Sequence, residues 1–184
     1  MSLISIATER LDLRPVKESD ADAMAAFYAD PEIIRYIPWP KRNREEINQA
    51  VRVATTRTSF EKEEDYLVLA IVRRSDDQLV GQVNAMYRSE ANMMAEIGYV
   101  VNPLFARQGY GSEATKGLID ALFATEKFHR IEARLDDRNL SSKALLERLG
   151  FRLEAHFLQD DFFKGEWTNT LVYAMLRSEW KTQP

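Results

Sequence analysis

Residues 93–114 restrict the possible folds more than any other part of the chain, because they join an apolar strand to a helix through a glycine-containing turn. The strand pattern ends at Asn102-Pro103, and Gly109 and Gly111 lie where the helix should begin. The first backbone N–H groups of a helix have no partner within it and point outward at the positive end of its dipole. Because neither glycine carries a Cβ atom, a ligand can approach the backbone closely. The segment therefore predicts a phosphate-binding turn.

The same two glycines also fit a dinucleotide-binding pattern. The letters GYGSEA at 109–114 satisfy G-x-G-x-x-G/A, and Glu132 or Asp136 lies near the position of its later acidic residue. Against this, residues 102–108 separate the strand from the turn, and that strand closes an antiparallel meander instead of opening a parallel unit. A P-loop is excluded because no Gly-Lys-Ser/Thr follows. A tight turn that binds nothing remains an alternative.

The remaining pattern predicts one mixed α/β domain over residues 1–184, with no linker or internal repeat. Short turns join three apolar strands at 66–73, 79–87 and 93–101, which indicates an antiparallel meander. Further strands are expected at 9–14, 130–136, 151–158 and 168–176, and helices at 19–29, 43–63, from the glycine turn to about 126, and from 139 to 149.

Composition excludes several classes of function. The net charge of -4 argues against nucleic acid as a partner, because such domains usually present a basic face. The chain has no cysteine, so it can form no disulfide, thiol nucleophile or thiolate metal site. With only His129 and His156 to supply imidazole, we expect no metal. No apolar stretch is long enough to cross a bilayer and no leader pattern is seen, so we expect no membrane contact and a cytoplasmic location.

Two motifs carry a resemblance to a known family. The letters EIGYVVNPLFARQGYGSEA at 96–114 and NLSSKALLERLGF at 139–151 resemble the acetyl-CoA-dependent GNAT N-acetyltransferases. The RimJ/RimL branch, which acetylates N-terminal amines of ribosomal proteins, is the most similar. The likeness continues, in the family's order, through TERLDLRP at 8–15, ADPEIIRYI at 29–37 and GEWTNTLVYAML at 165–176, and so covers nearly the whole chain.

The resemblance implies a GNAT fold: a twisted, mixed, mostly antiparallel sheet, flanked by helices and split between the fourth and fifth strands, at 93–101 and 130–136. Acetyl-CoA, as co-substrate, would place its pantetheine arm in the split and its pyrophosphate on the glycine turn. Ala106 and Arg107 depart from the family, which often has Gln or Arg and then Gly there; the charge of Arg107 could assist phosphate binding. The implied cofactor-binding residues are Tyr99, Val100, Val101, Arg107, Gln108, Gly109, Tyr110, Gly111, Ser112 and Asn139.

Acetyl transfer to an amine requires a base for the amine and a proton for the leaving thiolate. Without a cysteine or a G-x-S-x-G motif, direct attack within a ternary complex is the remaining route, as the family is understood to work. We predict Glu96 as the base, acting directly or through water, with a solvated strand carboxylate as the alternative. Leu146 replaces the tyrosine acid of many relatives. Ser142 is predicted as the proton donor; the alternatives are a helix cap and ordered water.

The sequence motifs say less about the acceptor than about the cofactor. Tyr36, Trp39 and Tyr87 are predicted to form an aromatic wall around a cationic amine. We expect the acceptor to be a primary amine, and a protein N-terminal amine is the first choice. The alternative is a small molecule such as a polyamine, an amino acid or an aminoglycoside. A non-catalytic acyl-CoA-binding protein with the same fold is the alternative from another class. The sequence leaves open whether the chain forms a homodimer.

Overall fold

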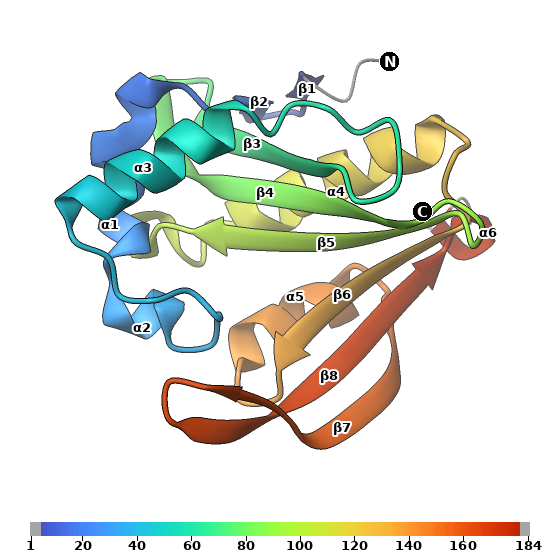
Figure 1. The fold of residues 1–184 in the computed structure, drawn as a ribbon. Helices are drawn as coiled ribbons and strands as arrows, with labels where there is room; N and C mark the ends of the chain where they lie inside the picture. Colours follow the sequence, from blue (N-terminus) through green and yellow to red (C-terminus); the bar gives the residue numbers. More distant parts are fainter. Residues whose placement is uncertain (1–4, 181–184) are drawn as a thin grey trace.

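The sheet at the centre of the molecule has the strand order β1-β2-β3-β4-β5-β6-β8-β7 (Figure 1). The computed structural model describes residues 5–180. All neighbouring strands are antiparallel except β5 and β6, which are parallel. The mixed, mostly antiparallel sheet predicted from the sequence is thus confirmed. Its strands are β1 (Ile6–Ala7), β2 (Leu11–Pro15), β3 (Tyr66–Arg73), β4 (Gln78–Ser89), β5 (Met94–Val101), β6 (Arg130–Asp136), β7 (Arg152–Phe163) and β8 (Glu166–Leu176).

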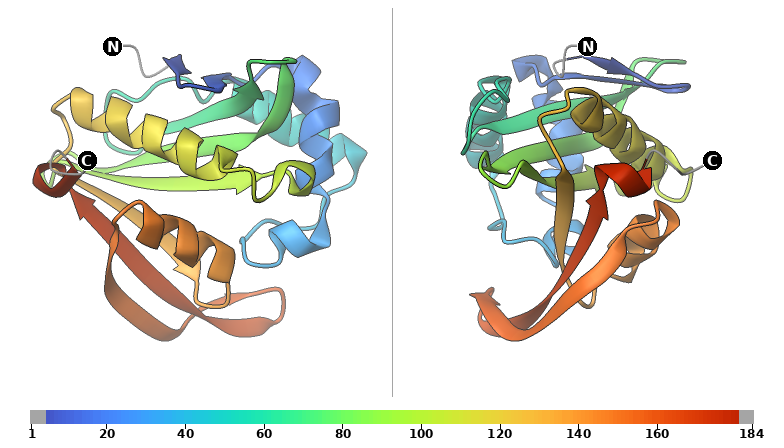
Figure 2. Two further views of the ribbon diagram at one scale, coloured as in Figure 1. Left: turned by 180° about the vertical axis from the view of Figure 1, so that it is seen from behind. Right: turned by 90° about the vertical axis from the view of Figure 1, so that its right-hand side faces the viewer.

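Helices cover both faces of the sheet, which explains why β3 reads as an uninterrupted apolar run. Leu67, Leu69 and Ile71 face the core beneath α4 (Tyr110–Ala124), with α5 (Leu140–Arg148) alongside it on the same face (Figure 2). Val68 and Ala70 face the opposite core, which is completed by α1 (Ala21–Tyr28) and α3 (Arg44–Thr55). Shorter helices are α2 (Pro31–Ile34), α6 (Arg177–Trp180) and the 3-10 turns Glu18–Asp20 and Pro103–Phe105.

The sheet is open between β5 and β6. These strands pair only at Met94 with Arg130, Ala95 with Ile131 and Glu96 with Glu132, and then diverge (Figure 1). From Ile97 onward, the edge of β5 that faces β6 therefore has no strand partner. Backbone N–H and C=O groups need hydrogen-bond partners, so this edge is able to pair with an extended ligand. The predicted split between the fourth and fifth strands of the sequence is confirmed here.

Two elements differ in length from the sequence prediction. α3 ends at Thr55, not near residue 63. The cause is Phe60, which leaves the α3 side and packs with Tyr87 and Phe128 in the core beneath α4. Asp65 holds the intervening loop by accepting hydrogen bonds from Ser59 and from the N–H groups of residues 61 and 62. At the other end of the chain, β7 continues to Phe163, so the β7–β8 hairpin is longer than expected.

Neither a membrane helix nor a metal cluster is found in the described part of the chain. Across residues 5–180, no helix combines the length and the apolar character that crossing a bilayer requires. Within the same residues, no three side chains of His, Cys, Asp or Glu type come together as metal ligands.

The buried carboxylate of Asp20 gives a test of the fold. Arg14 donates two hydrogen bonds to it at 2.8 Å, and the Lys17 N–H donates a third. Burial alone would raise the pKa of Asp20, but these hydrogen bonds and the Arg14 charge lower it. Asp20→Asn should reduce the free energy of unfolding by about 2 kcal/mol at pH 7, because one strong acceptor of a charged donor is lost.

The same pair predicts a dependence on pH. A pKa lowered by folding gives stability that is present above the unfolded-state value and is lost as the pH falls through the folded-state value. In urea titrations, the difference in the free energy of unfolding between wild type and Asp20→Asn should therefore be smaller at pH 3 than at pH 7. The exposed Asp22 is the matched control, and Asp22→Asn should change stability by less than about 0.5 kcal/mol. If this difference in the free energy of unfolding were equal at both pH values, the role given to Asp20 would be refuted.

Candidate active site

A cleft of about 510 Å³ opens at the split between β5 and β6. Its walls come from β5, the turn before α4, the start of α5 and the segment around α2. Most of the predicted site residues line it, although they come from four separate parts of the chain. They are Tyr36, Tyr99, Val100, Val101, Arg107, Gly109, Tyr110, Gly111, Ser112, Asn139 and Ser142.

The two glycines of the turn have different structural roles. Gly109 is the N-cap of α4 and has a φ of 83°, a left-handed conformation that favours glycine. Because it contributes no side-chain cap, the first N–H groups of α4 stay available at the cleft. A Cβ atom on Gly111 would lie 3.1 Å from Val101 and 3.3 Å from Leu145. Gly111 thus allows α4 to pack closely against β5 and α5, while a Cβ atom on Gly109 would lie 3.2 Å from Nη2 of Arg10.

The turn is fixed from outside the cleft by the hairpin between β1 and β2. Glu113 accepts hydrogen bonds from the backbone N–H and Nε of Arg10, at 2.7 and 2.6 Å, and from the Thr8 hydroxyl at 2.6 Å. Arg10 also donates to the carbonyl of Gln108 at 3.1 Å. Gln108 was predicted to bind the cofactor, but it does not line the cleft. Its backbone instead anchors the turn.

Two arginines bring positive charge to the turn. Arg107 and Arg148 both line the cleft, and neither forms an ion pair within the part of the chain that the structure describes. Arg148 also donates a hydrogen bond to Ser112 at 3.3 Å, which joins the end of α5 to the start of α4. Sequence reasoning missed Arg148. Its spacing from Ser141 and Leu145 places all three on one helical face, and that periodicity could have revealed it.

Ser142 and Tyr99 form a hydroxyl pair across the cleft. Their oxygens lie 2.8 Å apart, and Tyr99 also donates to the Ser142 carbonyl at 3.2 Å. Burial raises the pKa of Tyr99 to about 12, although the Ser142 hydroxyl acts in the opposite direction. The phenol therefore keeps its proton at neutral pH. The predicted tyrosine position on α5, Leu146, is fully buried in the core.

Asn139 holds the start of α5. Its Oδ1 accepts hydrogen bonds from the Ser142 N–H at 3.1 Å and the Ser141 hydroxyl at 2.9 Å. Its Nδ2 makes no hydrogen bond to any described residue, and Asn139 lines the cleft. One side chain thus caps the helix and keeps a donor free for a ligand.

Glu96 lies at the last paired position of β5, where the two strands begin to diverge. Strand alternation puts its side chain on the face opposite Tyr99, away from α4 and α5. Arg88 lies 3.4 Å from its carboxylate. Burial raises the pKa of Glu96 and the charge of Glu132 adds to this, while Arg88 and Arg134 act against it.

Asn84 is a second polar group on the Glu96 face, and sequence reasoning missed it. A Cβ atom on Gly98 would lie 2.9 Å from both amide atoms of Asn84, so that amide rests directly on the Gly98 backbone. Among the described residues the Asn84 side chain has no hydrogen-bond partner. A glycine inside a strand pattern indicates close approach of another group, and Gly98 was such a signal.

The predicted aromatic wall is only partly present. Tyr36 lines the cleft. Tyr87 is 4% exposed and packs between Phe60 and Phe128 in the core, so it cannot contact an acceptor and the prediction for it does not fit. The cause is strand alternation, which turns Tyr87 toward α4 and away from the Glu96 face. Trp39 lines a separate cavity beside α3 instead of the cleft.

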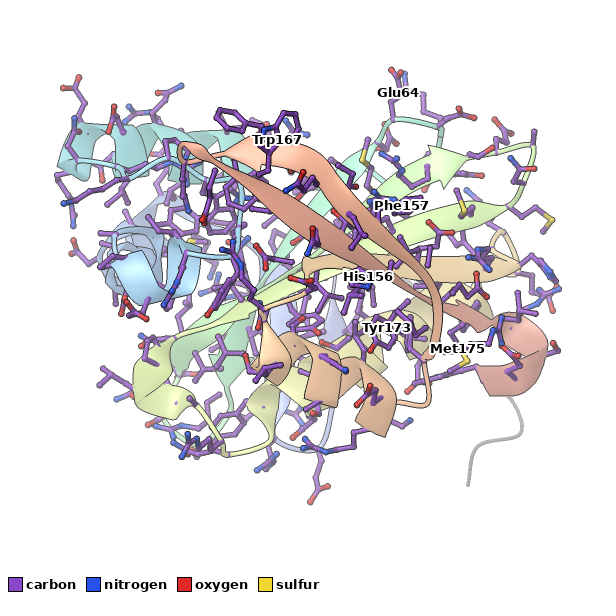
Figure 3. The ribbon with its side chains drawn as sticks, turned by 90° about the horizontal axis from the view of Figure 1, so that it is seen from below. Glu64, His156, Phe157, Trp167, Tyr173 and Met175 are labelled. Carbon is purple, nitrogen blue, oxygen red and sulfur yellow. The ribbon has the colours of Figure 1, made fainter. Side chains whose placement is uncertain are left out.

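The turn of the β7–β8 hairpin contacts the segment that follows α2. Lys164, at the hairpin turn, donates to the carbonyl oxygens of Ile37, at 2.9 Å, and Ile34. Figure 3 shows the hairpin crossing below the sheet, with His156 and Phe157 on β7 and Trp167 near the turn. His156 lies 3.1 Å from Asp137. The hairpin turn is therefore bound to the segment around α2, which lines the cleft.

Comparison with known proteins agrees with this geometry. The family described as "Acetyltransferase (GNAT) domain" matches residues 10–152. The uncharacterized N-acetyltransferase YnaD of Bacillus subtilis is 27% identical over 175 residues, which cover 95% of this chain and 98% of that protein.

Solved structures share the fold over nearly the full length. An acetyltransferase of the GNAT family from Bacillus anthracis is similar with a TM-score of 0.84 at 26% identity, covering 95% of this chain and 99% of that chain. RimL, a ribosomal L7/L12 alpha-N-protein acetyltransferase solved in complex with coenzyme A, has a TM-score of 0.79 at 20% identity, covering 94% and 97%.

Gly109 offers a test of the turn with coenzyme A as the probe. Gly109→Val should raise the Kd for coenzyme A at least tenfold in calorimetry, because valine is strained at a φ of 83° and its Cβ atom would lie 3.2 Å from the Arg10 side chain that anchors the turn. Gly165→Val is the matched control: Gly165 has a φ of 82°, and a Cβ atom there would meet no atom within 4 Å, so backbone strain is similar but remote from the turn. Equal Kd values for a folded Gly109→Val and wild type would exclude this phosphate site.

Proposed function

Since this chain belongs to the GNAT family of acetyltransferases, which use acetyl-CoA, we propose that its acceptor is a protein N-terminal amine and that this amine attacks the thioester directly. The observation that carries the proposal is the split between β5 and β6, which separates Glu96 on one face from the Tyr99–Ser142 pair on the other. In this proposal Glu96 would act as the base from one face of the sheet, and the Tyr99–Ser142 pair would donate a proton from the other.

The cleft fits acetyl-CoA, which supplies the activated acetyl group when it is bound. The free edge of β5 from Ile97 to Val101 would hydrogen-bond the amide groups of the pantetheine arm. The open N–H groups at the start of α4 and the two arginines of the cleft, Arg107 and Arg148, would hold the phosphates. The free Nδ2 of Asn139 would donate from the α5 side.

Glu96 would accept the proton of the attacking amine, directly or through water. Burial raises the pKa of Glu96, and a carboxylate with a raised pKa binds a proton more readily than an ordinary one. The contact with Arg88 would orient the Glu96 carboxylate, and the positive charge of Arg88 limits the rise in its pKa. The free amide of Asn84 lies on the same face and would orient the amine or a bridging water.

Ser142 and Tyr99 would together protonate the leaving sulfur. The Ser142 hydroxyl would give its proton to the thiolate and take one from Tyr99, whose oxygen is 2.8 Å away. A serine acyl-enzyme is not favoured, because the partners of Ser142 are a phenol and an asparagine instead of an imidazole.

A protein N-terminus as the acceptor is supported by one relative. RimL, whose fold this chain shares, is named for acetylating the alpha-amine of a ribosomal protein.

The acceptor is tested by measuring thiol release with a library of N-terminal peptides and a panel of small amines, with products identified by mass spectrometry. We expect the highest kcat/KM for a peptide. A polyamine, amino acid or aminoglycoside that outperforms every peptide would overturn this choice of acceptor, while the assignment to the family would stand.

Glu96→Gln tests the base. It should lower kcat about 100-fold at neutral pH, because amide nitrogen and oxygen cannot take up the proton, and should change the Kd for acetyl-CoA less than threefold. In wild type, kcat should fall as the pH drops through the raised pKa of Glu96, since the protonated form cannot act as a base. In Glu96→Gln, this fall of kcat at low pH (the acid limb of the pH profile) should be absent.

Glu132 supplies the control, because it is the cross-strand neighbour of Glu96 but is bound by Arg130. Glu132→Gln should keep the acid limb and most of kcat. An unchanged kcat in Glu96→Gln would remove Glu96 from the mechanism.

A double-mutant cycle tests the hydroxyl pair. Tyr99→Phe and Ser142→Ala should each lower kcat roughly tenfold, and the double variant should be little worse than either, because both hydroxyls serve one proton transfer. Single-turnover rates at saturating acetyl-CoA are the measurement. Effects that multiply would mean that the two hydroxyls act independently and that Ser142 is mainly a part of the α5 cap.

A further inference from the structure

We propose that a second cavity, on the same sheet face as Glu96, binds an anionic group of the acceptor, a carboxylate carried about 8 to 10 Å from the amine. This inference rests on the proposed function, because it names a chemical feature of the same acceptor. The cavity of about 510 Å³ lies between α3, the loop after α2 and strands β3 and β4. Figure 1 shows α3 lying across these strands.

Two arginines, Arg42 and Arg57, bring positive charge to the lining of this cavity. Arg42 lies over the rings of Tyr28 and Trp39, at 5.3 and 5.4 Å, and Arg57 lies 5.0 Å from the ring of Tyr66. All of these residues line the cavity. Stacking on aromatic faces holds each guanidinium group in place while leaving its N–H donors at the edge free to bind an anion.

Neither arginine has an acidic partner. Most arginines of this protein form ion pairs, but within residues 5–180 neither Arg42 nor Arg57 does. Arg107 and Arg148, on the cofactor cleft, share this property. The one carboxylate in the described cavity lining is that of Glu46, which already accepts a hydrogen bond from the Asn43 N–H as part of the α3 cap. The lining therefore carries an excess of positive charge.

Gln82 adds an independent sign that the cavity has a ligand. This side chain lines the cavity on the sheet side and is only 2% exposed. Its Oε1 accepts a hydrogen bond from the Tyr28 hydroxyl at 2.7 Å, which leaves the two Nε2 hydrogens facing the cavity without a partner among the described residues. This amide is a donor that can be reached from the cavity, and a bound carboxylate oxygen would accept its hydrogen bond.

The register of the sheet connects the cavity to the reaction centre. Gln82 pairs with Val100, which lines the cofactor cleft, and Tyr66 lies in the same cross-strand row as Glu96. Neighbouring strands are about 4.8 Å apart and residues rise about 3.4 Å along a strand, which puts Gln82 about 8 Å from Gly98, beside the split. A single acceptor could thus reach both places.

A peptide acceptor meets this requirement when an acidic side chain follows its N-terminus closely. An extended chain advances up to about 3.5 Å per residue, so Asp at positions 2, 3 and 4 covers the proposed distance between the amine and the carboxylate. The test uses three pairs of peptides that differ only by Asp or Asn at one of these positions. We expect at least a tenfold higher kcat/KM for Asp in one pair, and this ratio should fall to about one in Arg42→Gln and in Arg57→Gln.

Arg44→Gln is the matched control, because Arg44 begins α3 and is ion-paired with Asp22, outside the cavity lining. It removes the same charge and should preserve the preference for Asp. Ratios below about twofold in all three pairs, or a preference that persists in Arg42→Gln and Arg57→Gln, would overturn the proposal even if peptides prove to be good acceptors.

A binding measurement separates this proposal from the choice of acceptor. With the cofactor cleft saturated by coenzyme A, benzoate should bind saturably in calorimetry, and benzyl alcohol should not. The Kd for benzoate should rise at least fivefold in Arg42→Gln and Arg57→Gln but not in Arg44→Gln. If no peptide is acetylated, benzoate binding with this pattern would still support an anion site serving another acceptor, whereas absence of saturable binding would refute the site.

Discussion

The incomplete pairing of β5 and β6 is the constraint on which the rest of the structure depends. After Glu96 the two parallel strands separate, so the backbone of β5 from Ile97 to Val101 is left without a strand partner on one side. A polar edge inside a protein needs hydrogen bonds, and an extended ligand can supply them. The cleft is therefore a consequence of the sheet geometry, and side chains on either face only determine which chemistry takes place there.

Both helices that face the split present their N-terminal ends to the cleft, and different residues hold them. α4 begins after the left-handed Gly109, with the preceding turn tied to Arg10 and Glu113 from the outside. α5 begins at Asn139, whose side chain caps it. Arg148 joins the two helices through Ser112. The start of α4 is thus held by contacts on two sides, from Arg10 and Glu113 on one and from α5 on the other.

Alternation along β5 separates the functional groups between the two faces of the sheet. Tyr99 points to the α5 side and meets Ser142, while Glu96 points to the opposite side beside the amide of Asn84. The cofactor and the acceptor can then approach from different faces. The second cavity, with Arg42, Arg57 and Gln82, lies on the Glu96 face. The charge of that face is the basis of the proposal that it selects the acceptor.

The sequence by itself determined the strands from Tyr66 to Val101, the strand at Arg130–Asp136 and the turn at Gly109, because periodicity, turn residues and helix caps act locally. It could not show that Tyr87 is buried, that Tyr99 meets Ser142, or that Trp39 and Arg148 line different cavities. These facts depend on which face of a strand or helix each residue occupies and on what packs there. Only the tertiary structure decides this, because the contacts join segments distant in the chain.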